Sequence, residues 1–288
     1  MLPLVVSPAA PHELLPACRL LFADGHAEHS RDRLLADGDA SGLFVARAAR
    51  GRLRAAALVQ ALPGALGVAW APRGDSVEAV DAVTAAACTW LRGRGVKVCQ
   101  AFAAASARDE MAPLERSGFR HVTQLVSLRR HLYLEREPTH PLAFAAARPP
   151  FAEEFAATLL ATHEGTLDCP ELNAPRTPAE VLAGFTASPA VEWHLASLNG
   201  ERVGVVVVEY AREQETADLT YLGVVPAARG RGLGAALVNF AVSEAVTARA
   251  WALTVSVDTR NAPATKLYAR HGFAEYDRRE VWLASWSA

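Results

Sequence analysis

The sequence is short of several features that would place it in a specialised class of protein. Its 288 residues hold four cysteines, which are widely spaced and form no CxxC pair: Cys18, Cys88, Cys99 and Cys169. Neither a disulfide framework nor a structural zinc site is therefore expected. No window approaches about 18 uninterrupted apolar residues, so no transmembrane helix is predicted. The formal net charge of −2 gives no reason to expect a nucleic-acid partner or an anionic membrane.

The first fifteen residues, MLPLVVSPAAPHELL, lack a basic leader and a long apolar stretch, so they do not read as a signal peptide. Reduced thiols and a cytoplasmic location are the expectation. What the chain has in quantity is apolar side chains, at 51% hydrophobic and 21% charged residues. This composition is typical of a folded protein with a sizeable core, and the length suggests two domains or one large one.

Two halves of the chain follow a similar order of structural signals. A polar segment with two prolines, residues 135–141, reads as their join and predicts domains at 1–135 and 136–288. In the first half, strands are expected at 2–6, 42–48, 53–62, 65–70, 95–103 and 118–129, and helices at 11–23, 26–36, 76–91 and 106–117. In the second half, strands are expected at 142–147, 192–198, 202–210, 218–225, 251–257, 272–277 and 279–283, and helices at 151–162, 178–186, 232–247 and 262–271.

The common order predicts an α/β protein, with a mixed sheet and helices on both of its faces in each half. Within this order, LERSGFRHV at 114–122 matches LYARHGFAEY at 267–276. Each segment reads as a helix closed by a glycine, Gly118 or Gly272, and followed by a phenylalanine that begins a strand. Glycine allows the left-handed turn that ends many helices.

A glycine-rich stretch, VVPAARGRGLGA at 224–235, stands between a predicted strand and a predicted helix. The first amides of a helix lack internal partners, and glycines let the backbone approach an anion, so this layout suits a phosphate. A P-loop would need Gly-Lys-Ser/Thr where the chain has Gly234-Ala235-Ala236, and a dinucleotide fingerprint would need GxGxxG. The rival interpretation is a tight turn with two solvated arginines, Arg229 and Arg231.

These residues resemble motif A of the GNAT superfamily of acyl-CoA-dependent N-acyltransferases. The second family segment is similar to SVDTRNAPATKLYARHGF at 256–273, and the resemblance covers about residues 141–285. The whole chain resembles tandem GNAT proteins of the mycothiol synthase type, with a degenerate first domain. In that first half the corresponding loop, residues 72–78, keeps one glycine and carries Asp75 and Glu78, so we expect it not to bind coenzyme.

The resemblance implies acetyl-CoA as cosubstrate and no metal. It places the coenzyme against Val224, Val225, Arg229, Gly230, Arg231, Gly232, Leu233, Gly234, Ala235, Asn261 and Tyr268. The amide of Val224 or of Val225 would polarise the acyl carbonyl, and the residues do not choose between them. Asn261 also fits a helix N-cap.

The implied chemistry is direct attack of an amine on the acyl thioester. An ammonium group must first lose a proton, and Asp218 is the candidate acceptor, directly or through water, with Glu209 as second choice. For Asp218 the alternative is a solvated charge at the end of a strand. Tyr268 would protonate the leaving thiolate, and a buried core tyrosine is its alternative.

The acceptor pocket is expected beside THEGTLDCPELNAPRTP, residues 162–178, where Glu164, Asp168 and Glu171 could receive a cationic amine. A solvated acidic loop is the alternative interpretation. Cys169 has no paired base that would mark it as a nucleophile, and His163 and His194 are interpreted as ordinary loop and strand histidines.

Together these features predict a monomeric N-acetyltransferase that acts on a primary amine. A small-molecule amine, an aminoglycoside, a polyamine and a protein N-terminus all remain open as acceptors, as does acyl length. The alternatives are an acyl-CoA-binding sensor or scaffold without turnover, and a mycothiol-synthase-like acetyltransferase.

Overall fold

The structure, a computed structural model, describes residues 4–22, 26–36, 40–48, 51–132, 141–185, 190–211 and 215–286. The chain forms two compact units, which are Met1–Val122 with Arg279–Ala288, and Thr123–Arg278. The predicted join at 135–141 lies outside the described residues except for Pro141. No helix in the described part of the chain is long and apolar enough to cross a membrane.

The first unit is a mixed sheet with helices on both faces. Its strands are β1 (Val5–Pro8), β2 (Leu43–Arg47), β3 (Leu53–Leu62), β4 (Leu66–Ala69), β5 (Arg73–Gly74), β6 (Val98–Ala103) and the carboxyl-terminal part of β13 (Ala274–Ser285). Among these described strands, the β4–β6 pair is parallel and the other pairings are antiparallel. The α-helices are α1 (Leu14–Leu21), α2 (Ala27–Ala36), α3 (Val77–Gly93) and α4 (Ala112–Arg116).

The second unit repeats this architecture. Its strands are β8 (Ala143–Ala147), β9 (Val191–Leu198), β10 (Glu201–Ala211), β11 (Thr216–Val224), β12 (Ala252–Asp258) and most of β7 (Arg120–His131). Among the pairings of its described strands, the β11–β12 pair is parallel and the others are antiparallel. The α-helices are α5 (Glu153–Thr162), α6 (Pro178–Gly184), α7 (Leu233–Thr247) and α8 (Ala262–Arg270).

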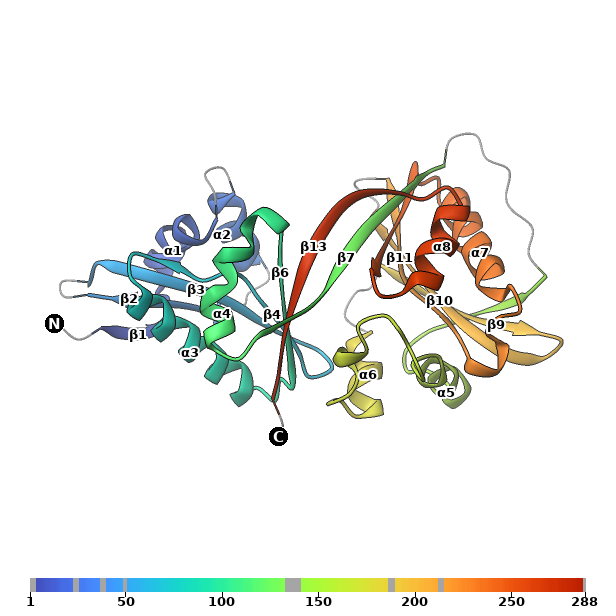
Figure 1. The fold of residues 1–288 in the computed structure, drawn as a ribbon, viewed down its shortest axis with the longest axis horizontal. Helices are drawn as coiled ribbons and strands as arrows, with labels where there is room; N and C mark the ends of the chain where they lie inside the picture. The colour runs from blue at the N-terminus through green and yellow to red at the C-terminus, as the bar shows by residue number, and fades with distance from the viewer. Residues whose placement is uncertain are drawn as a thin grey trace. The chain divides into compact units, whose positions relative to one another are not determined.

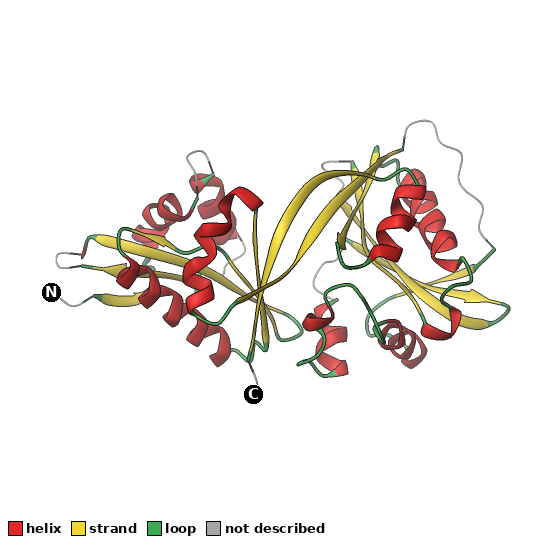
Figure 2. Ribbon diagram, viewed as in Figure 1, coloured by secondary structure: helices red, strands yellow, loops and turns green. Residues whose placement is uncertain are grey.

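Alternating side chains on β10 build the two cores of the second unit. Val205 and Val207 pack toward α5, and Val206 and Val208 pack toward α7. All four valines are fully buried, because a central strand is covered on both faces and reads as a continuous apolar run. Figure 2 shows the helices against the strands of each unit, and Figure 1 shows α7 and α8 lying together in the second.

The predicted mixed α/β fold and the repeated order of elements are confirmed. The two predicted helix ends are equivalent: the Phe119 N–H donates to the Leu114 carbonyl at 3.0 Å, and the Phe273 N–H donates to the Tyr268 carbonyl at 3.1 Å. Gly118 and Gly272 have φ angles of +96° and +77°, as a left-handed helix end requires.

Two element predictions were wrong. The strands expected at 272–277 and 279–283 are one strand, β13, because the polar residues that read as a break lie at exposed positions along it. The helix expected at 106–117 is a 3₁₀ segment, Ala105–Met111, followed by the short α4. Ala107 has non-helical angles (φ −105°, ψ 15°), and Pro113 has no N–H to continue the ladder.

Candidate active site

The parallel strands β11 and β12 are paired over only part of their length and then diverge. They pair only where Thr216–Asp218 face Ala252–Thr254, and β11 has a register shift opposite Val207 and Val208 of β10. A cavity of about 320 Å³ opens beyond the last pair. It is lined by Thr162, residues 165–168 and 219–224, Arg229, Gly234, Val255, Ser256, Asn261, Pro263, Ala264, Leu267 and Tyr268.

The turn after β11 presents backbone rather than side chain to one end of this region. Gly230 and Gly232 have φ angles of +74° and +77°, which L side chains rarely adopt. Gly232 is the N-cap residue of α7 and has no side chain that could accept a hydrogen bond from the first turn. Early amides of α7, at Leu233 and Gly234, therefore lack a capping side chain, and the helix dipole adds positive potential there.

Arg229 braces this turn from within. Its Nε donates to the Val224 carbonyl at 3.0 Å, and its Nη2 donates to the Thr162 carbonyl at 3.0 Å. The guanidinium thus joins the end of β11 to the end of α5 while it also lines the cavity. Arg231, by contrast, is exposed. Of the two arginines predicted to bind an anion, Arg229 therefore also has a structural role, because it links β11 to α5.

The two candidate amides at the end of β11 point in opposite directions. The Val225 N–H donates to the Val203 carbonyl at 3.0 Å. In an antiparallel ladder successive residues alternate between pointing at the partner strand and pointing away from it. The Val224 amide, which is paired in register with Gly204, therefore points away from β10, toward the side where β12 has diverged.

Tyr268 of α8 lies in the cavity wall and is 6% exposed. Burial raises its pKa, and the nearby carboxylates of Asp168 and Asp218 raise it further, so the phenol keeps its proton at neutral pH. Its ring packs edge-on against Phe273 at a centroid distance of 5.5 Å. At the start of the same helix, Asn261 also lines the cavity, and its Oδ1 accepts from the Ala264 N–H at 3.2 Å.

Asp218 stands at the last paired position, just outside the cavity lining. Thr254 Oγ1 donates to its Oδ2 at 2.6 Å, and Thr220 Oγ1 donates to its Oδ1 at 3.4 Å. Glu209 is its direct partner on β10. Burial raises the pKa of Asp218, and the negative charge of Glu209 adds to the rise.

Of the three acids predicted to receive an amine, the structure brings Asp168 to the cavity. The Asp258 N–H donates to Asp168 Oδ1 at 2.8 Å, which orients the carboxyl group. Its partly desolvated surroundings raise the pKa of Asp168. Glu171 instead forms a two-point salt bridge with Arg260, with distances of 2.6 and 2.9 Å, and Glu164 is exposed and outside the lining.

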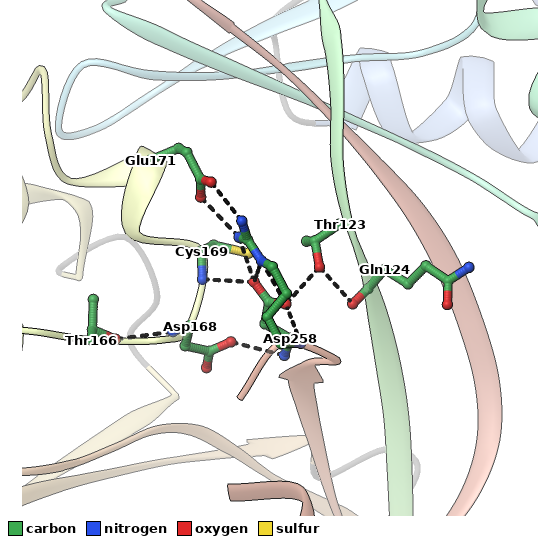
Figure 3. Close-up of polar contacts among 8 residues, drawn as sticks. Thr123, Gln124, Thr166, Asp168, Cys169, Glu171 and Asp258 are labelled. Atoms are coloured by element: carbon green, nitrogen blue, oxygen red, sulfur yellow. Dashed lines mark hydrogen bonds and ion pairs between the residues drawn. The ribbon is translucent and has the colours of Figure 1, made fainter. Parts of the chain in front are cut away.

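A buried carboxylate fixes the connection between α5 and α6. Figure 3 shows the contacts that converge on Asp258, which is fully buried. Thr123 Oγ1 and the Arg260 N–H donate to its Oδ1 at 2.6 and 2.9 Å, and the Cys169 N–H donates to its Oδ2 at 3.0 Å. Arg260 Nη2 donates to the same Oδ2 at 2.7 Å.

These donors outweigh the burial that would otherwise raise the pKa of Asp258, and they hold it at about 2. Asp258 was not among the site residues predicted from the sequence. The only signal was an acid directly after an apolar strand, in the segment VDTRN at 257–261, and its partners Thr123 and Cys169 lie 135 and 89 residues away.

The corresponding loop of the first unit is built differently. Ser76 caps α3, with its Oγ accepting from the Ala79 N–H at 3.3 Å, so a side chain occupies the place that is open in α7. Asp75 and Glu110 line a cavity of about 730 Å³ at this loop. Leu114 occupies the position equivalent to Tyr268, as the matching hydrogen bonds at the two helix ends show.

Comparisons with known proteins agree with this geometry. Residues 159–273, which lie within the second unit, match the model of the acetyltransferase (GNAT) family. No curated protein matches the chain.

Solved structures give the fold of the whole chain. A GCN5-related N-acetyltransferase from Sphaerobacter thermophilus superposes with a TM-score of 0.65 at 19% identity, covering 99% of this chain and 97% of that one. A tandem GNAT protein from the clavulanic acid biosynthesis pathway gives 0.54 at 15% identity, covering 98% of each chain. The chain therefore has the fold of tandem GNAT proteins.

Proposed function

We propose that the second unit transfers an acetyl group from acetyl-CoA to a primary amine. The observation that carries this proposal is the cavity between the separated strands β11 and β12, which has a glycine turn with uncapped amides near one end and a buried tyrosine in its wall. The family match supports acyl transfer from an acyl-CoA in general. We infer in addition that the acyl group is acetyl and that the acceptor is a primary amine.

The residues present fit the phosphates of a coenzyme. A pyrophosphate binds where backbone amides point outward at a helix start, and Gly230 and Gly232 keep that approach free of side chains. Arg231 is exposed and can add a charge-assisted contact to a phosphate. Asn261 uses its Oδ1 to cap α8, so its side-chain Nδ2 would bind the pantetheine arm.

For this reaction the protein must polarise the thioester carbonyl, accept a proton from the amine and protonate the leaving thiolate. Starting from the ammonium form, the nitrogen loses one proton to a base before it bonds to the thioester carbonyl carbon. It loses a second proton as the C–S bond breaks, and one proton reaches the thiolate sulfur. The Val224 amide is the proposed donor to the carbonyl oxygen, since the Val225 amide is bound to Val203. Tyr268 is the proposed acid, because its raised pKa keeps the phenol protonated until a thiolate forms.

Two carboxylates are proposed to act on the acceptor amine. Asp168 lies in the cavity wall and would bind the ammonium form, so it selects a cationic acceptor. Asp218 lies outside the lining, so it would accept the proton through water, and its raised pKa brings it closer to the working pH. Glu209 tunes Asp218 across the strand pair rather than contacting the amine.

Calorimetric titration with acetyl-CoA tests coenzyme binding. We expect one site in the wild-type chain, because Ser76 caps α3 in the first unit, and no site in Gly232→Glu, which adds strain and negative charge at the turn. Gly200→Glu is the matched control, since Gly200 also has a positive φ (+88°) but lies in the β9–β10 hairpin. A second binding site in the wild type would contradict our account of the first unit.

Release of free thiol in the presence of an amine panel tests turnover. The panel contains a polyamine, an aminoglycoside, glucosamine, a mycothiol precursor and a peptide with a free N-terminus. Amine-dependent thiol release supports the transferase. Tight acetyl-CoA binding without release for any amine would favour the acyl-CoA sensor instead, and a response confined to mycothiol precursors would favour the mycothiol-synthase-like reaction.

A further inference from the structure

A second group of ionisable side chains lies in the second unit between β9 and α7. Glu192 and His194 are two residues apart on β9 and so share one face of the sheet, and Glu244 projects from the helix that covers that face. His194 Nε2 lies 3.8 Å from Glu192 Oε2 and 3.9 Å from Glu244 Oε2. Both distances are too long for hydrogen bonds.

His194 is the unusual member of this group. Its Nε2 is buried and is the one buried side-chain nitrogen or oxygen without a hydrogen-bond partner in the described part of the chain. The residue is 8% exposed, and its ring packs edge-on against Phe240 at 4.8 Å. A neutral imidazole offers the lone pair of one ring nitrogen to a metal ion.

We propose that Glu192, His194 and Glu244 bind a divalent metal ion, with zinc as the best fit. An ion about 2.0–2.2 Å from each donor atom can sit between atoms that are 3.8 and 3.9 Å apart. One imidazole nitrogen and two carboxylate oxygens form a donor set for a first-row divalent ion, and the two carboxylates balance its charge. The ion also supplies the partner that His194 lacks.

The ion has a route to this position from solvent. Glu192 and Glu244 line an open cavity of about 540 Å³, together with Tyr210, Glu215 and Arg249. Three carboxylates against one guanidinium give the cavity a net negative potential that favours a cation. The Glu192 side chain is 55% exposed, so water can complete the coordination.

The other cluster of potential ligands in the second unit does not fit a metal. Asp168, Cys169 and Asp258 lie close together, but the Asp258 carboxylate already accepts from Thr123, Cys169 and Arg260. The Arg260 guanidinium occupies the place that a cation would need. This cluster therefore serves as the internal control for the proposed site.

Metal binding at this position is separate from acyl transfer. The ligands lie on β9 and on the last half of α7, whereas the glycine turn precedes the first residue of that helix. An ion here would tie the helix to the sheet and would stabilise the folded state by mass action. A negative result for zinc binding would therefore leave the proposed acetyltransferase reaction unaffected, and the absence of acetyl transfer would not contradict zinc binding.

The test is calorimetric titration of zinc chloride into the full, tag-free chain after treatment with a chelator. We expect one zinc ion per chain, and an affinity at least about 10-fold weaker in His194→Gln and in Glu192→Gln. Glu192 is exposed, so its variant folds even if the His194 variant does not. Cys169→Ser is the control and should keep wild-type affinity.

Thermal unfolding with and without zinc is the second readout. Zinc should raise the Tm of the wild type and of Cys169→Ser, and should raise that of His194→Gln clearly less. The proposal is overturned if the wild type binds no zinc, if the His194 and Glu192 variants bind as well as the wild type, or if Cys169→Ser is the variant that loses binding.

Discussion

The Asp258 backbone N–H donates to Asp168 Oδ1 at 2.8 Å, so the end of a β-strand orients a carboxyl group in the wall of the cavity. The Asp258 side chain returns the contact by accepting from the Cys169 N–H at 3.0 Å. Two hydrogen bonds in opposite directions thus hold the α5–α6 connection against β12. The position of the proposed amine-binding acid therefore depends on Asp258.

Asp168→Asn should weaken the binding of the acceptor amine. An ammonium group loses a charge-assisted partner, so the KM for the amine should rise about 10- to 100-fold. The affinity for acetyl-CoA should stay the same, because the coenzyme phosphates are proposed to lie at the glycine turn. Steady-state kinetics check this, with Glu164→Gln as the control on an exposed acid of the same loop. Equal KM values in the two variants would contradict a role for Asp168.

Tyr268→Phe should lower kcat by about 100-fold, the usual scale for loss of a general acid. The affinity for acetyl-CoA in calorimetry should not change, because the ring and its packing against Phe273 remain. Tyr276→Phe is the matched control, since Tyr276 is 49% exposed and does not line the cavity. An unchanged kcat in Tyr268→Phe would make Tyr268 a core tyrosine and not an acid.

The pH profile of kcat/KM should identify the proton acceptor. If Asp218 accepts the proton, activity falls as pH drops through its raised pKa, and Asp218→Asn removes most of the activity. Glu209→Gln removes a negative neighbour that raises this pKa, so the acid limb should move to lower pH while the maximum rate persists. An acid limb that stays in place in Glu209→Gln would exclude Asp218 as the titrating group.

Asp258→Asn should destabilise the fold by about 2–3 kcal/mol, because the variant loses charge-assisted hydrogen bonds around a fully buried group. Glu171→Gln should cost under about 1 kcal/mol, since its bridge to Arg260 is partly exposed. Chemical denaturation at neutral pH measures both differences. Equal costs for the two variants would mean that Asp258 does not hold the connection.

The lowered pKa of Asp258 also predicts that the stability of the fold depends on pH. The folded pKa of Asp258, about 2, lies below the value of about 3.9 for an unfolded aspartate. Its contribution is therefore complete above about pH 4 and is lost as pH falls toward 2. The difference in unfolding free energy between the wild type and Asp258→Asn should shrink across that window, and a difference that stays constant would contradict the lowered pKa.

The order of helices and strands could be predicted from the sequence because local patterns determine it. The valines of β10 read as a buried strand, and Gly118 and Gly272 mark the helix ends at which their φ angles are positive. The continuous strand β13 was missed because its exposed polar residues look like a turn when their neighbours are unknown.

The glycine turn at 229–234 could also be predicted from the sequence, since its conformation depends on residues adjacent in the chain. The other contacts of the site join distant segments. Thr123 and Asp258 meet across 135 residues, and His194 approaches Glu244 only because α7 packs over β9. Local preference determined the elements and the turn. Packing decided which carboxylates face the cavity, which amide at the end of β11 points away from β10, and which histidine in the described part of the chain has a buried nitrogen without a partner.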